Sequence, residues 1–387
     1  MWGKTQYRSL PFSYNVRSLL MRKGSSALTV ASIALTVLVF IVMAGLANGL
    51  TGMYASTGRD DALVVLSKGS GSAEISRLRD AALFTLKYHR AIRYRADGTP
   101  MFSEEVYAVK PLKTAKTAGE MRWLPIRGIY VRNLDIYPAI RMVAGRPLQA
   151  PQEAMIGKSL LAKLGNVQVG DLIPIGRQEH RIVGIFSAAG MAYESELWVS
   201  NDDLRIDYGI SYQSIAVFPV KAGESVDAVI REVDDDPQLQ MEAKTEAAYF
   251  ATIAENYAFV TVIGNVIAFI MSIGALFAGM NTMYTSVSSR IREIGTLRAL
   301  GFSRRSIQIS FILESLILAG LSGASGAVVA LLFNGVSLSF MRSAFHIRIT
   351  PVIVLQGLFL AVVVGFVGGY FPARKASRMK IIEVMNA

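Results

Sequence analysis

The chain has 387 residues, of which 52% are hydrophobic, and its mean hydropathy is +0.38. This composition is too apolar for an ordinary soluble domain and indicates membrane spans. The sequence contains no cysteine, which excludes disulfide bonds and thiolate metal sites, and its three histidines do not have the spacing of a zinc site.

The net charge of +11 would suit a nucleic-acid-binding protein, but the distribution of the charges does not. Residues 51–255 hold 24 of the 40 Lys and Arg residues and 26 of the 29 Asp and Glu residues. The rest of the chain therefore carries 16 basic residues and 3 acidic ones. These basic residues flank apolar runs, which is the pattern of membrane topology, so we expect no nucleic-acid partner.

The chain begins with a basic segment, residues 1–26, which we predict to be cytoplasmic and amphipathic. The apolar run at 27–50 follows it and is long enough to cross a bilayer core, which needs roughly 20 residues in a helix. A cleaved signal peptide is the alternative, because Arg22 and Lys23 precede the run. Since the apolar core of a signal peptide has only about 7–15 residues, we predict an uncleaved transmembrane helix at 27–50.

Residues 51–256 are predicted to form a mixed α/β domain outside the cytoplasm. The runs DALVVLS at 61–67 and HRIVGIF at 180–186 have the composition of strands. Residues 158–164 and 225–233 have the periodicity of short helices.

Two stretches of this domain suggest chemistry, and neither has the pattern that the chemistry requires. The triplet GKS at 157–159 looks like the end of a phosphate-binding loop, but Gln152 stands where the first glycine of that motif belongs. Glu194 and Glu196 offer two carboxylates, but no histidine lies near them in sequence, so we predict a solvated edge rather than an acid/base pair. We therefore expect no catalytic residue and no metal site.

Three further apolar runs are predicted to cross the membrane. Glu314 is the only charged residue in the second of them, and Pro372 closes the third. In chain order the remaining segments are a transmembrane helix at 257–285, a cytoplasmic loop at 286–308, a transmembrane helix at 309–340, a short outer loop at 341–349, a transmembrane helix at 350–372 and a cytoplasmic tail at 373–387.

The basic residues near the span ends predict the orientation. The N-terminal segment and the 286–308 loop hold five Lys or Arg residues each, and the tail holds four. Four spans place these three segments on one side, which the positive-inside rule identifies as the cytoplasm. The predicted fold is thus a membrane protein of four transmembrane α-helices, with both termini cytoplasmic and a mixed α/β extracytoplasmic domain inserted between helices 1 and 2.

Glycines four residues apart recur in the spans, at Gly45 and Gly49 and at Gly365 and Gly369. This spacing lets helices approach closely in a membrane. Packing within one bundle and a seam between two copies both account for it.

The loop between the second and third of these four spans contains the stretch SRIREIGTLRALGFSRRSIQ, residues 289–308. Isoleucine or leucine recurs every three residues from 291 to 300, so the apolar stripe drifts around a helix and charged residues interleave with it. Gly301 fits a C-terminal cap, and Ser303 fits the N-cap of the next helix. An interfacial helix and a helix that docks on a protein partner both fit this pattern.

The sequence resembles the MacB/FtsX-like permease family of ABC transporters, of the unfused, mechanotransmission type. Four stretches carry the resemblance: FSYNVRSLLMRKGSSALT; MVAGRPL with EAMIGKSLLAKLGNVQVGDLIPIG and HRIVGIF; SSRIREIGTLRALGFSRRSIQISFILES; and YFPARKASRMKIIEVMNA. REIGTLRALG is close to the signature of the family and is the most specific of them. Four spans with one large outer segment after the first are also the topology of the family.

The resemblance implies that the 286–308 loop is the coupling helix, which docks on a separate ATPase. Glu314 is a buried-charge candidate that we expect to pair with Arg304 or Arg305, linking this helix to the third span, although a side chain that only reaches the interface is the alternative. The implied docking residues are Arg290, Glu293, Ile294, Gly295, Leu297, Arg298, Leu300 and Gly301.

The resemblance also implies the partners. The sequence contains no Walker motif, so ATP and Mg²⁺ would be bound by two copies of a separate ABC ATPase subunit, and this chain would be neither an enzyme nor a cofactor-binding protein. A second permease copy, giving a homodimer, is expected by symmetry. Membrane lipids, a periplasmic adaptor and an outer-membrane channel are further expected partners at the bacterial inner membrane.

The function implied is that of the permease subunit of an ATP-driven transporter. It would export or extract a lipid, a lipoprotein or an amphiphilic compound at the outer face of the inner membrane. The alternative is a non-transporting mechanotransmission complex that regulates a periplasmic partner such as a cell-wall hydrolase. The large, strand-rich outer domain favours the exporter.

Overall fold

The structure is a computed structural model that describes residues 23–114, 116, 120–340 and 343–378. The described chain forms two compact units. The helical unit comprises Phe259–Gly335 and the described parts of Met1–Asn48 and Ile347–Ala387, and the α/β unit comprises Gly49–Ala258 and the described parts of Val336–His346. Most of the predicted N-terminal segment at 1–26, and residues 379–387 of the predicted tail, lie outside the described residues.

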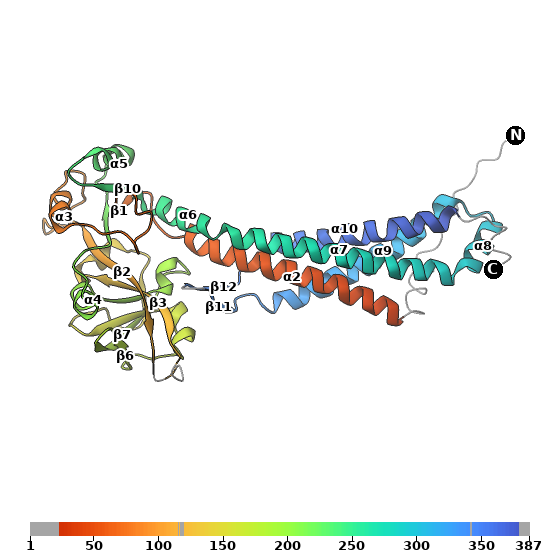
Figure 1. Ribbon diagram of the computed structural model, residues 1–387, viewed down its shortest axis with the longest axis horizontal. Helices are drawn as coiled ribbons and strands as arrows, with labels where there is room; N and C mark the ends of the chain where they lie inside the picture. Colours follow the sequence, from red (N-terminus) through yellow and green to blue (C-terminus); the bar gives the residue numbers. More distant parts are fainter. Residues whose placement is uncertain (1–22, 115, 117–119, 341–342, 379–387) are drawn as a thin grey trace. The chain divides into compact units, whose positions relative to one another are not determined.

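Four long apolar helices confirm the four predicted spans. Each contains a stretch long and apolar enough to cross a membrane. In Figure 1 the long helices run side by side. They are α2 (Lys23–Ala55), α7 (Ala258–Ser289), α9 (Arg304–Leu331) and α10 (Pro351–Arg378), and the short helix α8 (Ile291–Ala299) joins α7 to α9.

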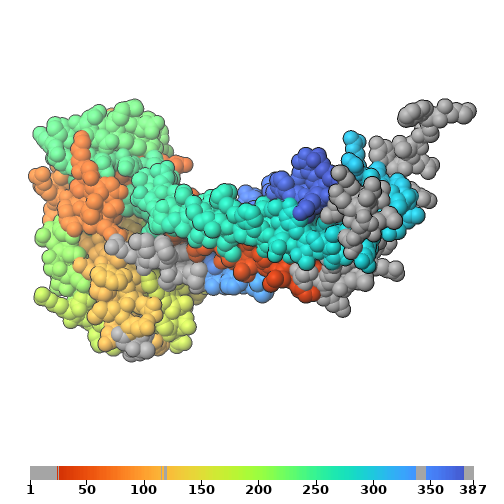
Figure 2. Space-filling model, turned by 45° about the vertical axis from the view of Figure 1, so that its right-hand side comes forward, coloured from red at the N-terminus to blue at the C-terminus, as the bar shows by residue number. Residues whose placement is uncertain are grey.

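Many of the exposed side chains of α7 are large and apolar, and many of its buried residues are small. Gly264, Ala268, Ala275 and Gly279 are among its buried residues. Figure 2 shows α7, in teal, as a continuous band on one face. Large exposed side chains along it suit contact with lipid rather than water: Phe259, Val262, Val266, Phe269, Ile270 and Phe277.

Close approach of α9 and α10 depends on glycine. A Cβ atom added at Gly365 would lie 2.3 Å from the Cβ atom of Ala319, and one added at Gly369 would lie 2.0 Å from Oγ of Ser315. At Gly45, an added Cβ atom would lie 2.8 Å from Cγ1 of Ile349. Gly49 is buried as well. Gly45, Gly365 and Gly369 therefore pack within one chain, which is the first of the two interpretations that their spacing left open.

The third and fourth spans differ from their predicted limits. Helix α9 ends at Leu331 instead of continuing to residue 340. Turns follow it, and Gly335 takes a left-handed φ of 80°, so a helix cannot continue through that residue. The following residues form strand β11 (Ser337–Phe340), which pairs with β12 (Ser343–His346) in the segment predicted to be a loop. Helix α10 continues through Pro372 to Arg378, six residues beyond the predicted end of the span.

A ten-stranded mixed sheet organises the α/β unit. Its strand order is β10-β1-β9-β2-β3-β8-β5-β7-β4, with β6 paired to β7. The β3–β8 and β5–β7 pairs are parallel, and the other pairs are antiparallel. The strands are β1 (Ala62–Ser67), β2 (Ser103–Leu112), β3 (Arg122–Ile129), β4 (Arg141–Gly145), β5 (Glu153–Gly157), β6 (Leu172–Ile175), β7 (Gln178–Ser187), β8 (Leu197–Ser200), β9 (Ile215–Pro219) and β10 (Met241–Thr245).

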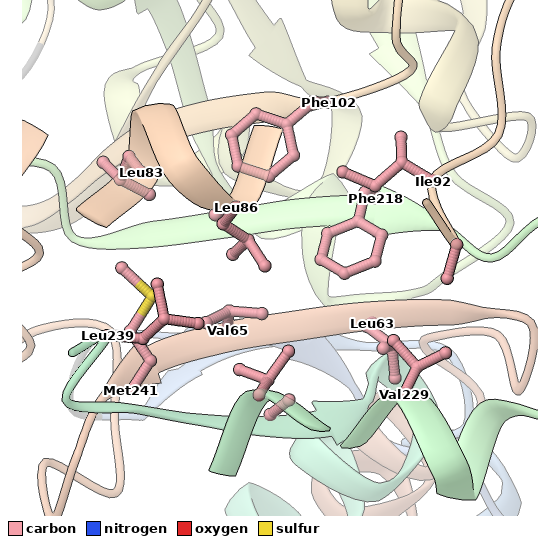
Figure 3. Close-up of a cluster of buried hydrophobic side chains, with 14 of the residues drawn as sticks. Leu63, Val65, Leu83, Leu86, Ile92, Phe102, Phe218, Val229, Leu239 and Met241 are labelled. Carbon is pink, nitrogen blue, oxygen red and sulfur yellow. The ribbon is translucent and has the colours of Figure 1, made fainter. Parts of the chain in front are cut away.

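Helices cover this sheet and close two apolar cores. Helices α3 (Asp80–Lys87) and α5 (Val226–Asp235) pack on β1, β9 and β10, where Leu83, Phe218 and Val229 are buried together (Figure 3). The second core lies among β2, β3 and β5–β8. The predicted helix at 225–233 is confirmed as α5, and the one at 158–164 is a pair of 3-10 turns, η3 (Lys158–Leu160) and η4 (Ala162–Leu164). The other helical elements are η2 (Val131–Ile136), η5 (Ala192–Ser195), α4 (Asn201–Tyr208) and α6 (Glu246–Asn256).

Candidate functional site

Helix α8 is held at its C-terminal end by the two caps that the sequence predicts. Gly301 has a φ of 91°, its N–H donates to the carbonyl of Arg298, and the N–H of Phe302 donates to the carbonyl of Leu297, both at 3.1 Å. These bonds form a Schellman motif, which ends α8. Two residues later the Ser303 hydroxyl oxygen accepts from the N–H of Ser306 at 3.1 Å and starts α9.

A buried ion pair connects the start of α8 to α9. The side chain of Arg290 is 8% exposed and that of Glu314 is 4% exposed. Nη1 of Arg290 donates to Oε2 of Glu314 at 3.2 Å, and its Nε donates to Oε2 of Glu293 at 2.9 Å. The guanidinium also lies 5.5 Å from the ring centroid of Phe311. Together these contacts fix the entry to α8 against α9.

The predicted pairing of Glu314 with Arg304 or Arg305 is wrong. Both of these arginines are exposed at the start of α9, whereas Glu314 is buried. Nine or ten residues along a helix correspond to about 14–15 Å, which is too far for an ion pair. The predicted link between α8 and the third span exists, but its arginine is Arg290, which precedes α8.

Three of the eight residues proposed for docking are buried within this chain. Arg290, Ile294 and Gly295 are buried. Ile294 lies in an apolar cluster with side chains from α7, α9 and α10, among them Val287, Phe311 and Ala373. A partner cannot reach these residues without rearrangement of the bundle.

The remaining residues of α8 form a mixed exposed face. The side chain of Glu293 is 59% exposed, Leu300 is 65% exposed, and Leu297 and Arg298 are half-buried. The three-residue apolar repeat thus drifts from the buried Ile294 to the exposed Leu300, as the mismatch with a 3.6-residue helix predicts. Arg292, Thr296 and Ala299 are exposed on α8 too, and the signature alone did not select them.

A second polar cluster lies inside the α/β unit and centres on Arg127 of β3. Its Nη1 donates to Oε2 of Glu105 at 2.6 Å, and its Nε and Nη2 donate to the two oxygens of Glu196 at 2.6 and 2.7 Å. Nε1 of Trp198 also donates to Glu196, at 2.8 Å. Although burial opposes the charge, Glu196 and Glu105 hold the pKa of Arg127 well above its usual value.

The prediction of a solvated edge at Glu194 and Glu196 is wrong, because both residues are buried. Glu194 accepts hydrogen bonds from the hydroxyls of Ser159 and Ser187, at 3.0 and 2.8 Å, and from the N–H groups of Ala188 and Gly190. Burial raises the pKa of Glu194, but these bonds lower it below its usual value. Ser159, in the phosphate-loop-like triplet, thus has a structural role.

Comparisons with known proteins give the chain its family. A family model described as MacB-like periplasmic core domain matches residues 26–236, more than half of the chain, and one described as FtsX-like permease C-terminal matches residues 265–381. The chain belongs to the MacB/FtsX-like permease family. It is an ABC transporter permease of this type, and its four apolar helices and its periplasmic-type core make it a membrane protein with an extracytoplasmic domain.

Three relatives show how much of each protein is shared. The chain is 28% identical over 264 residues to the pyoverdine export ATP-binding/permease protein PvdT of Pseudomonas entomophila, which covers 60% of this chain and 38% of that one. It is 32% identical over 143 residues to the macrolide export ATP-binding/permease protein MacB of Hyphomonas neptunium, covering 37% and 22%. It is 28% identical over 239 residues to the uncharacterized ABC transporter permease MJ1507 of Methanocaldococcus jannaschii, covering 57% and 58%. The chain therefore spans less than two thirds of each relative.

Two solved structures are weakly similar to the chain. One is the periplasmic region of MacB from Actinobacillus actinomycetemcomitans, with a TM-score of 0.38 and 11% identity, covering 50% of this chain and 92% of that one. The other is the extracellular domain of the transporter YknZ from Gram-positive bacteria, with a TM-score of 0.37 and 13% identity, covering 48% and 100%.

Proposed function

We propose that this chain is the permease subunit of an ATP-driven transporter in a bacterial inner membrane. It couples ATP hydrolysis by a separate ATPase to the export or extraction of a lipid, a lipoprotein or an amphiphilic compound. The observation that carries this proposal is the exposed mixed face of α8, a helix that a Schellman motif ends and that a buried ion pair attaches to α9. A rigidly attached helix with such a face suits the reception of force from a partner.

In this proposal α8 is the coupling helix, and its exposed residues contact the ATPase. Apolar side chains such as Leu300 fill a groove in the partner, and charged ones such as Glu293 set the register. Arg290 and Ile294 then transmit a displacement of α8 to α9. Since Gly365 and Gly369 hold α10 against α9, the two helices move together.

ATP and Mg²⁺ are assigned to two ATPase subunits, and a second permease copy completes a dimer. The absence of a Walker motif from these 387 residues supports this assignment, as does the name of the Methanocaldococcus jannaschii relative, which is that of an ABC transporter permease. We place α8 and both termini in the cytoplasm and the α/β unit in the periplasm, because the basic residues flank the spans on one side.

The test is to purify the full chain with its ATPase and to identify the bound lipids and proteins by mass spectrometry. An enriched lipid, lipoprotein or amphiphile supports the proposal, and a periplasmic adaptor or an outer-membrane channel would extend it to tripartite export. A complex that retains a cell-wall hydrolase and no such cargo would replace transport with mechanotransmission to that enzyme. A chain that captures no ATPase would overturn both functions.

A further inference from the structure

The α/β unit contains a cavity with aromatic walls that none of the functions above uses. Its volume is about 210 Å³, and β2, β3, η5, the last turn of α2 and helix α6 contribute to its lining. The rings of Tyr54 and Tyr257 stack with centroids 5.4 Å apart and an interplanar angle of 7°. The ring centroid of Phe250 lies 6.4 Å from that of Tyr54 and 5.2 Å from that of Tyr249. Tyr107 completes the set of five aromatic residues in the lining.

Among the described residues that line the cavity, carboxylates outnumber basic side chains. Arg127 and Glu196 both line the cavity. Glu105 is not among the lining residues, but it accepts a hydrogen bond from Arg127. Glu74 lines the cavity as well. Because two carboxylates already neutralise the guanidinium, an anionic ligand would meet net negative charge here, whereas a cation would meet an attractive field.

The rings of this region already hold one cation by their faces. The guanidinium carbon of Arg127 lies 5.3 Å from the ring centroid of Tyr107, 5.1 Å from that of Tyr193 and 5.9 Å from that of Trp198. Aromatic faces carry partial negative charge, which is why they attract ammonium and guanidinium groups. The stacked pair of Tyr54 and Tyr257, with Phe250 beside it, offers further faces of the same kind.

We propose that this cavity binds the head group of an amphiphilic organic cation, with its ammonium against the faces of Tyr54, Tyr107 and Tyr257 and its apolar part against Phe250. Pockets for drug-sized ligands measure about 300–1,000 Å³, so this smaller cavity takes one head group rather than a whole amphiphile. All residues of the lining belong to the α/β unit and none belongs to α8, so the site can be tested whether or not the chain transports.

The experiment measures binding of benzyltrimethylammonium to the full chain in dodecyl maltoside by calorimetry, without ATP or ATPase. Neopentylbenzene, in which carbon replaces the ammonium nitrogen, is the uncharged match, and benzenesulfonate is the anionic control. We expect the cation to bind at least about tenfold more tightly than the uncharged match and the anion not to bind. Absence of cation binding, or equal affinity for the cation and its uncharged match, would overturn the proposal.

Variants place the site. Tyr257→Leu removes one ring face and should weaken cation binding at least about tenfold, whereas Tyr257→Phe keeps the face and should bind as the unsubstituted chain does. Glu74→Gln removes a negative charge from the lining and should weaken the binding as well. This variant tests the site even if Tyr257→Leu fails to fold. Phe84→Leu, an exposed aromatic on α3, is the matched control and should change nothing. Unchanged affinity in both Tyr257→Leu and Glu74→Gln would place the cation elsewhere.

Discussion

Nη1 of Arg290 lies 3.2 Å from Oε2 of Glu314, and both side chains are buried. Arg290 immediately precedes α8, and Glu314 lies in the third turn of α9. The pair therefore ties the start of a short exposed helix to the interior of the bundle. A buried charge without its partner is strongly unfavourable, so this contact can be tested by removing one member or both.

Glu314→Gln should lower the thermal midpoint of the detergent-solubilised chain. Removing one member of a buried pair costs about 3–5 kcal/mol. We expect a loss at the lower end of this range, because Arg290 keeps its contact with Glu293. The double variant Arg290→Met/Glu314→Met should recover most of the loss, since apolar replacements of buried pairs are often neutral. If the double variant is no more stable than Glu314→Gln alone, the two side chains do not act as a pair.

Substitutions on the exposed face of α8 should weaken ATPase binding without unfolding the chain. Arg292→Glu reverses an exposed charge on α8 and Leu300→Asp removes an exposed apolar contact, and each should reduce the measured affinity at least about tenfold. Leu172→Asp, at a half-exposed leucine of the α/β unit, is the matched control and should bind normally. Wild-type affinity in both α8 variants would show that the ATPase docks elsewhere.

Features that depend on neighbouring residues could be predicted from the sequence. Each span needs only a sufficient apolar run, and the caps at Gly301 and Ser303 act on the ends of their own helices. Composition also predicted an α/β domain between the first two spans, since strand-like and helix-like runs alternate there.

Features that depend on distant partners were mispredicted. The partner of Glu314 lies 24 residues before it, on the other side of α8, and the buried Glu194 accepts a hydrogen bond from Ser159, 35 residues earlier. Neither contact leaves a local pattern of residue types. Which face of α8 is buried depends likewise on α7, α9 and α10, so the signature could not separate Ile294, inside the bundle, from the exposed Leu300.

Gly365→Ala should destabilise the helical bundle. The added Cβ atom would lie 2.3 Å from the Cβ atom of Ala319, so α9 and α10 must separate and lose packing along their contact. Gly274→Ala is the control, because nothing lies within 4 Å of its added Cβ atom, and the better helix propensity of alanine should leave the midpoint unchanged or slightly higher. Equal thermal midpoints in detergent for the two variants would contradict close packing at Gly365.

Cysteine labelling should place α8 and the α/β unit on opposite sides of the membrane. The natural sequence has no cysteine, so each introduced thiol is the only one. Glu224→Cys, exposed in the α/β unit, should react with an impermeant maleimide in intact cells, and Ala299→Cys, exposed on α8, should react only after permeabilisation. Labelling of both from the same side would refute the four-span topology.

Acid should remove a stabilising contribution from Glu153. Both terminal nitrogens of Arg146 donate to its carboxylate, as do the N–H groups of Gln149 and Ala150, and these bonds lower the pKa of Glu153 from 4.5 to about 2. Because the unfolded chain binds this proton more readily, the contribution is complete above pH 4.5 and is lost as the pH falls through about 2. Glu153→Gln should therefore lower the thermal midpoint at pH 7, and its deficit should vanish near pH 2.

Glu179→Gln, at an exposed residue of β7, is the control and should show no such pH-dependent deficit. A Glu153→Gln deficit that stays constant down to pH 2 would show that the carboxylate charge is not its cause.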